Sequence, residues 1–394
     1  MSDSDGHDHG RVIAARHAVT PLELFFDLVF VFALTQVTTL MADDLAWLGL
    51  LRGFAVLAAI WWAWAGYAWL TNTVNIDDDL LSRLVMLVAM AAMLVVGLAA
   101  PAAFGEYSIL FGIAYLVVRL LHVTLYAVVS RNDPDVLGAV RRLATGIVLA
   151  PLLILVAGFL PAGPVRGVLW AVALLVDFGS PIVAGTSGWK VDAGHFAERH
   201  GLVIIIALGE SVVAVGVTAA GEPLTTAVVT AATLSVAIVA SMWWLYFDVV
   251  ALAAERKLHA LSGRDQAAMA RDSYSYLHLF MVWGIVLVAL GLKKCLTDLH
   301  QPLSAVPAVA LLGGLAVYLL AHVAFRLRNM RTLNVQRLVT AVLLALLVPI
   351  ALRVESLVTI GMASAVMVLL VGYEVIRFRE GRHYLRHHSE GQAH

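Results

Sequence analysis

The chain has 394 residues, of which 61% are hydrophobic and only 13% are charged, and its mean hydropathy is +0.89. Because charged residues make up about a quarter of a typical soluble domain, this composition excludes a soluble globular fold. The net charge of −1 argues against nucleic acid as a partner, since nucleic-acid-binding proteins present a basic face.

Apolar blocks separated by short polar turns predict transmembrane helices along most of the chain, because about 20 apolar residues in a helix cross the hydrocarbon core of a bilayer. We expect spans at 22–41, 48–70, 82–103, 107–129, 143–160 and 167–185, followed by 201–219, 227–252, 274–292, 304–326, 338–352 and 357–378. The predicted fold class is an all-α polytopic membrane protein with about twelve transmembrane helices. Polar tails are expected at 1–20 and 379–394.

The distribution of basic residues predicts the orientation, because cytoplasmic loops hold an excess of Lys and Arg. On the side of the N-terminus the predicted loops and tails hold 20 of the 26 Lys and Arg residues, the other side holds 5, and Arg119 lies within a span. Residues 1–10 carry acidic groups and no basic ones, so they do not resemble a signal peptide. We therefore expect both termini on the cytoplasmic side of the cytoplasmic (inner) membrane.

Similar segments recur in the same order in the two halves of the chain, which predicts six-helix repeats at 21–189 and 190–378. Trp61-Trp62 pairs with Trp243-Trp244, residues 120–123 (LLHV) with 320–323 (LAHV), and 142–146 with 337–341. Six spans per unit make the repeats parallel, an arrangement that places a site between the halves. Chance similarity between apolar helices remains the alternative.

Ionisable residues inside the spans are the main candidates for function, because a charge at the bilayer centre is costly. Arg119, Asp177 and Glu210 are expected to lie deepest, with either Glu210 or Asp177 as the partner of Arg119. Further relay or binding candidates are Asp27, His122 and His278. His122 shares one helix face with Arg119. The alternative for each is a structural role that fixes helix packing.

His195, Glu198 and Arg199 form a polar segment that is expected at the membrane surface, just before the seventh predicted span. His195 and Glu198 are three residues apart, a spacing that could present two metal-binding groups on one helix face. No third ligand is identifiable, so a capping or salt-bridge role is favoured, and we predict no metal site and no cofactor.

Three segments resemble the bacterial low temperature requirement protein A family: residues 20–31 (TPLELFFDLVFV), residues 195–199 with 207–211 (ALGES), and residues 274–278 (YSYLH) with Gly284-Ile285. The family more often has a proline at the position of Phe280. The resemblance implies an integral membrane protein of the bacterial envelope, linked by name to growth in the cold. Residues 25–27 (FFD) are also similar to the Phe-Ser-Asp motif of lysosomal-type potassium channels.

The leading functional hypothesis is a secondary transporter or ion-conducting protein that moves an ion or a small molecule through a site between the halves. One alternative is a membrane-embedded enzyme that acts on a lipid or isoprenoid, with His195, Glu198 and His200 as surface catalysts. Another is a structural or sensory membrane protein. Membrane lipid is an expected partner in each case, and the oligomeric state is not predicted.

Overall fold

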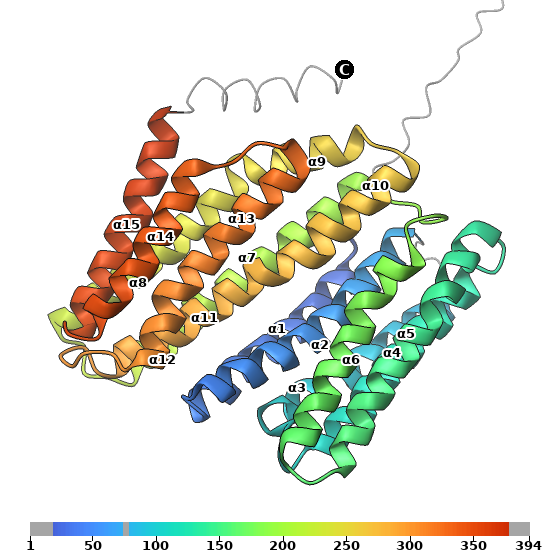
Figure 1. Cartoon of the computed structure of the whole chain (residues 1–394), viewed down its shortest axis with the longest axis horizontal. Coiled ribbons are helices and arrows are strands. Elements are labelled where there is room, and N and C mark those ends of the chain that lie inside the picture. The colour runs from blue at the N-terminus through green and yellow to red at the C-terminus, as the bar shows by residue number, and fades with distance from the viewer. Residues whose placement is uncertain (1–18, 74–78, 378–394) are drawn as a thin grey trace, which may run out of the picture.

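A computed structural model describes residues 19–73 and 79–377, and these residues contain helices but no strand (Figure 1). The first half comprises α1 (Pro21–Asp43), α2 (Trp47–Thr73), α3 (Leu80–Ala99), η2 (Ala100–Ala102), α4 (Ser108–Val129), α5 (Pro134–Phe159) and α6 (Pro164–Ala184). The second half comprises α7 (Ala193–Ala220), α8 (Thr226–Phe247), α9 (Val250–His259), α10 (Gly263–Met269), η3 (Ala270–Leu277), α11 (His278–Thr297), α12 (Ala305–Ala308), η4 (Val309–Gly313), α13 (Gly314–Met330), α14 (Val335–Ala351) and α15 (Ser356–Arg377). The polar tails predicted at 1–20 and 379–394 lie almost entirely outside the described residues.

Eleven helical segments of the described residues are long and apolar enough to cross a membrane, and α14 adds a shorter apolar helix of 17 residues. The prediction of an all-helical, multi-pass membrane protein is therefore confirmed. The ninth span is longer than predicted, because a continuous helical segment begins at Gly263 rather than at 274. Its first turns are polar, so the apolar pattern of the sequence predicts a later start.

The N-termini of several helices follow from local sequence. Thr20, Asp79, Asp133, Asp192 and Thr225 each cap a helix by accepting a hydrogen bond from a backbone N–H in its first turn. Proline occupies the first turn of α1, α5 and α6, where its missing N–H costs no hydrogen bond.

The helices of each half pack in the same cyclic order. In the first half, each helix contacts the next one around a ring, in the order α1, α3, α4, α5, α6 and α2, and α2 contacts α1. In the second half, the corresponding order of contacts is α7, α11, α13, α14, α15 and α8, and α8 contacts α7. The halves meet where α1 and α2 pack against α7 and α11, at the centre of Figure 1.

The distribution of apolar side chains fits a protein surrounded by lipid. Leu175, Val183 and Leu369 are between 71% and 90% exposed although they lie in the middle or last turns of apolar helices. Trp61 and Trp64, by contrast, are fully buried where the halves meet. In a bilayer, apolar side chains can face outward because lipid tails replace water around them.

A π-helical segment, η3, interrupts the helix that runs from Gly263 to Thr297. Trp61 Nε1 donates to the Ser275 carbonyl oxygen at 2.7 Å, and Trp69 Nε1 donates to the Ser275 hydroxyl at 2.9 Å. The wider turn of a π-helix leaves carbonyl groups free for such bonds. These two bonds attach α2 of the first half to η3 of the second.

Candidate functional site

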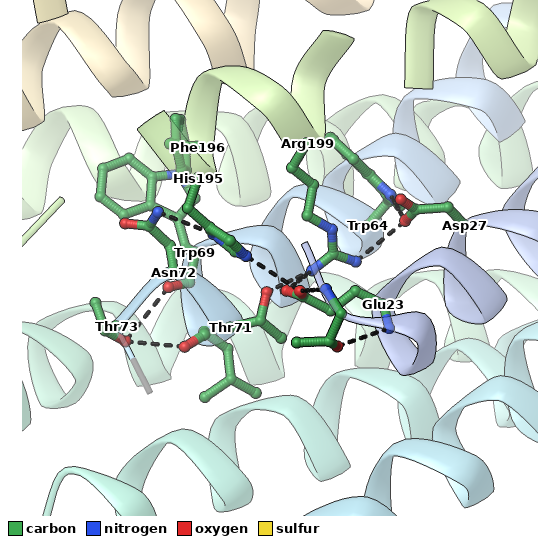
Figure 2. A network of polar contacts seen from close by, with 12 residues as sticks. Glu23, Asp27, Trp64, Trp69, Thr71, Asn72, Thr73, His195, Phe196 and Arg199 are labelled. Carbon is green, nitrogen blue, oxygen red and sulfur yellow. Dashed lines mark hydrogen bonds and ion pairs between the residues drawn. The ribbon is translucent and has the colours of Figure 1, made fainter. Parts of the chain in front are cut away.

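A network of polar and charged side chains is buried where α1 and α2 meet α7 (Figure 2). Its first member is Glu23, which lies in the first turn of α1 and is 1% exposed. Glu23 forms a capping box with Thr20, because Thr20 N donates to Glu23 Oε2 at 2.9 Å and Glu23 N donates to Thr20 Oγ1. The helix start therefore fixes the position of a buried carboxylate.

Arg199 of α7 connects two carboxylates of α1. Its Nη1 lies 2.7 Å from Glu23 Oε1 and its Nη2 lies 3.1 Å from Asp27 Oδ1, and Nη1 also donates to the hydroxyl of Thr71 on α2. Glu23 and Asp27 are four residues apart on α1, so both carboxylates lie on the helix face that meets Arg199. Figure 2 shows the guanidinium between the two acids.

Asp27 is fully buried, and only one of its two carboxylate oxygens has a partner among the described residues. Trp64 Nε1 donates to Asp27 Oδ1 at 2.7 Å, and the same oxygen faces Arg199. Asp27 Oδ2 has no hydrogen-bond partner among the described residues. A buried, unpaired carboxylate oxygen is unfavourable unless it carries a proton or meets another partner.

The hydrogen bonds around His195 define which of its nitrogens carries the proton. The Asn72 amide is oriented by Asp192, whose backbone N donates to Asn72 Oδ1 and whose carbonyl oxygen accepts from Asn72 Nδ2, both at 2.9 Å. Asn72 Nδ2 therefore also donates to His195 Nδ1, at 3.2 Å. Because Nδ1 accepts, the imidazole is neutral with its proton on Nε2, which donates to Glu23 Oε2 at 3.1 Å.

The charges of this network do not balance if both acids are ionised. Glu23 and Asp27 contribute two negative charges and Arg199 contributes one positive charge, while the hydrogen bonds of His195 fit a neutral ring. Burial of a net charge in a helix bundle is costly. One proton restores neutrality, and the free Oδ2 of Asp27 is the carboxylate oxygen that can accept it.

A second buried ion pair, between Arg119 of α4 and Asp177 of α6, lies inside the first half. Arg119 Nη2 is 2.6 Å from Asp177 Oδ1, and the Tyr115 hydroxyl donates to Asp177 Oδ2 at 3.1 Å. The open question of the partner of Arg119 is thereby resolved in favour of Asp177. This pair balances its own charge, unlike the network on α1 and α7.

Comparison with known proteins identifies the family. Residues 18–372 match the family described as Bacterial low temperature requirement A protein (LtrA). The chain belongs to this family. It is also similar to an uncharacterized protein of Rhizobium meliloti (strain 1021), with 30% identity over 309 residues that cover 75% of this chain and 74% of the relative. No solved structure matches the chain.

The segments that carry the resemblance to the LtrA family meet at the network. Residues 20–31 contain Glu23 and Asp27, and residues 195–199 contain His195 and Arg199. The third segment lies beside the other two in space, because the rings of Tyr274 and His200 pack together with their centroids 5.2 Å apart. Segments far apart in the sequence thus form one continuous buried region.

The segment before the seventh predicted span is not exposed as a whole, because other helices cover two of its three residues. Arg199 forms an ion pair with Glu23, as the favoured salt-bridge role predicts. His195 and Arg199 are 4% and 0% exposed, whereas Glu198 is exposed. The sequence of these residues is polar, but α7 already begins at Ala193 and packs this turn against α1. His200 is also buried, so only Glu198 of the three residues expected as surface catalysts is exposed.

The other predicted residues are dispersed. Glu210 is partly exposed on α7 and lies beside Thr35 of α1, away from the Arg119 pair. His278 bonds through Nε2 to the Tyr246 hydroxyl at 2.8 Å and through Nδ1 to the Ser273 carbonyl at 2.9 Å. These two bonds fit a role in packing for His278.

Sequence reasoning missed several members of the network, namely Glu23, Trp64, Thr71, Asn72 and Asp192. One signal was present, because Glu23 and Asp27 are four residues apart, as are His195 and Arg199. Each pair predicts two charged or titratable groups on one helix face, and the two faces are complementary. The described residues contain no group of three or more His, Cys, Asp or Glu side chains that could hold a metal ion.

Proposed function

We propose that this protein is a proton-translocating membrane transporter in which Asp27 binds and releases the proton. The observation that carries this proposal is the charge imbalance of the network, where two buried carboxylates face one guanidinium and Asp27 Oδ2 has no partner among the described residues. Ionisable groups buried within a membrane protein commonly mark ion pathways. A small-molecule substrate and membrane lipid are the partners of such a transporter.

Protonation of Asp27 changes the interactions that hold α1 against α7. With Asp27 ionised, Arg199 is shared between both acids, and with Asp27 neutral it pairs mainly with Glu23. A change of one charge in a buried, low-dielectric site is large enough to shift a two-state equilibrium between helix arrangements. Binding and release of the proton would thereby be coupled to movement of the two halves.

We also propose that residues 21–189 and 190–378 are parallel repeats, with the transport site between them. The shared cyclic order of helix contacts supports this arrangement. Arg142 and Arg337 also support it, because they occupy aligned positions in the two halves of the sequence. Arg142 in the third turn of α5 donates to the Ala184 carbonyl at the end of α6, and Arg337 in the first turn of α14 binds Glu374 near the end of α15.

In this proposal both termini are cytoplasmic and the protein lies in the bacterial inner membrane, as the excess of Lys and Arg on one side favours. The network then lies toward the cytoplasmic end of α1 and α7, since Glu23 is in the first turn of α1. A proton on Asp27 would exchange with the cytoplasm when the site faces inward.

The test is proton flux through the purified full-length protein in liposomes. A pH gradient is imposed with the membrane potential clamped, and proton entry is followed with a trapped pH dye. Asp27→Asn keeps the size of the side chain and an acceptor for Trp64 and Arg199, but it cannot bind a proton reversibly. We expect wild-type protein to conduct protons and Asp27→Asn vesicles to behave as empty vesicles do.

The matched control is Glu374→Gln, which neutralises a carboxylate of another interhelical ion pair, 2.7 Å from Arg337. This variant should retain the wild-type flux. If wild-type vesicles take up protons no faster than empty vesicles, or if Asp27→Asn conducts normally, the proposed proton pathway is wrong. A purely structural network predicts the second outcome, provided that the variant is folded.

A further inference from the structure

A cavity separate from the network lies between α2, α4, α5 and α6 and is closed on one side by α10 and η3 of the second half. The space in which a water-sized molecule can be centred is about 80 Å³, and the cavity is partly open at its mouth. Its position near the junction of the halves makes it a candidate site for a small molecule.

The wall of this cavity is mostly apolar and strongly aromatic. Trp62, Trp69, Tyr126 and Trp189 line it, and the Trp189 ring packs edge-on against Trp69 and Tyr126 with centroids 5.4 and 5.6 Å apart. These contacts hold the rings in fixed orientations. Fixed aromatic rings favour a planar, apolar molecule, which can stack against their faces or edges.

Two buried polar side chains, Arg119 and His122, also line the cavity. They are 2% and 4% exposed. Arg119 Nε and both ring nitrogens of His122 have no hydrogen-bond partner of normal geometry among the described residues. Since buried polar atoms are almost always paired, these atoms point to a ligand that completes their hydrogen bonds.

The charges at this end of the cavity indicate what the ligand presents. Asp177 already neutralises Arg119, at 2.6 Å, so a further anion is not required for balance. A second cation beside Arg119 is unfavourable, which favours a neutral His122. Arg119 Nε–H and one imidazole N–H then lack an acceptor of normal geometry among the described residues, and a neutral acceptor such as a carbonyl oxygen fits them.

Gly66 of α2 leaves the space that the His122 ring occupies. A Cβ atom at position 66 would lie 2.9 Å from His122 Cε1. The close approach of α2 to His122 therefore holds the ring at the cavity wall, where it meets Arg119 one helical turn away on α4.

We propose that this cavity binds a planar, largely apolar small molecule with a neutral carbonyl-type acceptor, which accepts hydrogen bonds from Arg119 and His122 while its ring lies among Trp62, Trp69 and Trp189. This site is distinct from the proton site at Asp27. Binding here does not depend on whether the protein moves protons.

The test uses the full chain in lipid nanodiscs and three probes of the same ring size: 2-acetylnaphthalene, 2-ethylnaphthalene and 2-naphthoate. Calorimetric titrations, with empty nanodiscs subtracted, give the dissociation constants. We expect the ketone to bind saturably and about tenfold more tightly than the ethyl compound, which lacks an acceptor, and more tightly than the carboxylate.

Two variants and a control test the role of the named residues. His122→Leu should reduce the preference for the ketone over the ethyl compound, whereas Leu143→Trp, which fills the cavity from α5, should abolish binding of both. His322→Leu changes the residue that aligns with His122 in the second half, is equally buried and lies outside the cavity lining, so it should bind as wild type. Equal binding of the three probes, no saturable binding, or an equal effect of His122→Leu and His322→Leu would overturn the proposal.

Discussion

Arg199 of α7 and Glu23 of α1 form an ion pair with 2.7 Å between Nη1 and Oε1, and each side chain is only 1% exposed. The two residues are 176 positions apart in the sequence. The pair therefore joins the two halves of the chain at their interface. Because neither charge has access to water, loss of one partner should have large consequences for stability.

We expect Arg199→Met to reduce the free energy of unfolding by about 3–5 kcal/mol, because it leaves two buried carboxylates without a cation. Unfolding in mixed micelles with increasing denaturing detergent measures the change. The double variant Arg199→Met with Glu23→Gln should recover part of the loss. The control Arg353→Met removes an exposed cation and should be near neutral. A neutral effect of Arg199→Met would show that the charges are compensated elsewhere.

The tautomer of His195 should depend on Asn72. In the wild type, ¹⁵N spectra of labelled histidine should show the His195 proton on Nε2, because Asn72 Nδ2 donates to Nδ1. Asn72→Asp replaces this donor with an acceptor and should place a proton on Nδ1. The His195 signals are assigned by their absence in His195→Gln. A proton on Nδ1 of the wild-type ring would contradict the described orientation of Asn72.

Gly284 on α11 should tolerate no larger residue, because a Cβ atom there would lie 2.8 Å from the Gly314 carbonyl oxygen on α13. Gly284→Val should destabilise the protein by about 1–3 kcal/mol or more through overpacking. Gly209→Val is the control, since a Cβ at Gly209 has no neighbour within 4 Å among the described residues. Comparison of thermal unfolding in detergent separates the packing effect from the shared change in helix propensity.

A pH-dependent contribution to stability is expected between α5 and the connection before α7. Lys190 donates a hydrogen bond to Asp133, which lowers the pKa of the Asp133 carboxyl, and the same bond raises the pKa of Lys190. The stabilisation is fully present between the unfolded pKa of Asp, about 4, and that of Lys, about 10. It is lost as the pH falls through the lowered pKa of Asp133 or rises through the raised pKa of Lys190. Lys190→Met should therefore lower the melting temperature slightly near neutral pH and have no effect once the pH is below the lowered pKa of Asp133.

The orientation proposed for the membrane can be tested by cysteine labelling in a Cys295→Ser background, since the chain has one cysteine. Glu106→Cys lies in the exposed connection between α3 and α4, and Asn132→Cys lies in that between α4 and α5. We expect a membrane-impermeant maleimide to label Glu106→Cys in intact spheroplasts and Asn132→Cys only after lysis. The reverse pattern would invert the proposed topology.

The sequence by itself determined the class of the fold and most of its helices. Apolar composition is a local property that adds up along each segment, so a stretch such as 108–129 predicts a membrane span whatever surrounds it. For the same reason the buried position of Arg119 and the set of its candidate partners followed from the sequence. The spacing of Arg119 and His122 also predicted correctly that they share one helix face.

The tertiary structure alone decided which charges meet. Glu23 and Arg199 lie near the polar ends of apolar segments, where local sequence cannot distinguish a side chain that faces lipid headgroups or water from one covered by another helix. Asp177 rather than Glu210 pairs with Arg119 because α4 and α6 both pack against α2 and α5 within the first half, whereas Glu210 lies on α7 of the second half. Ion pairs between distant residues depend on how helices pack, and packing is a property of the whole chain rather than of any segment in it.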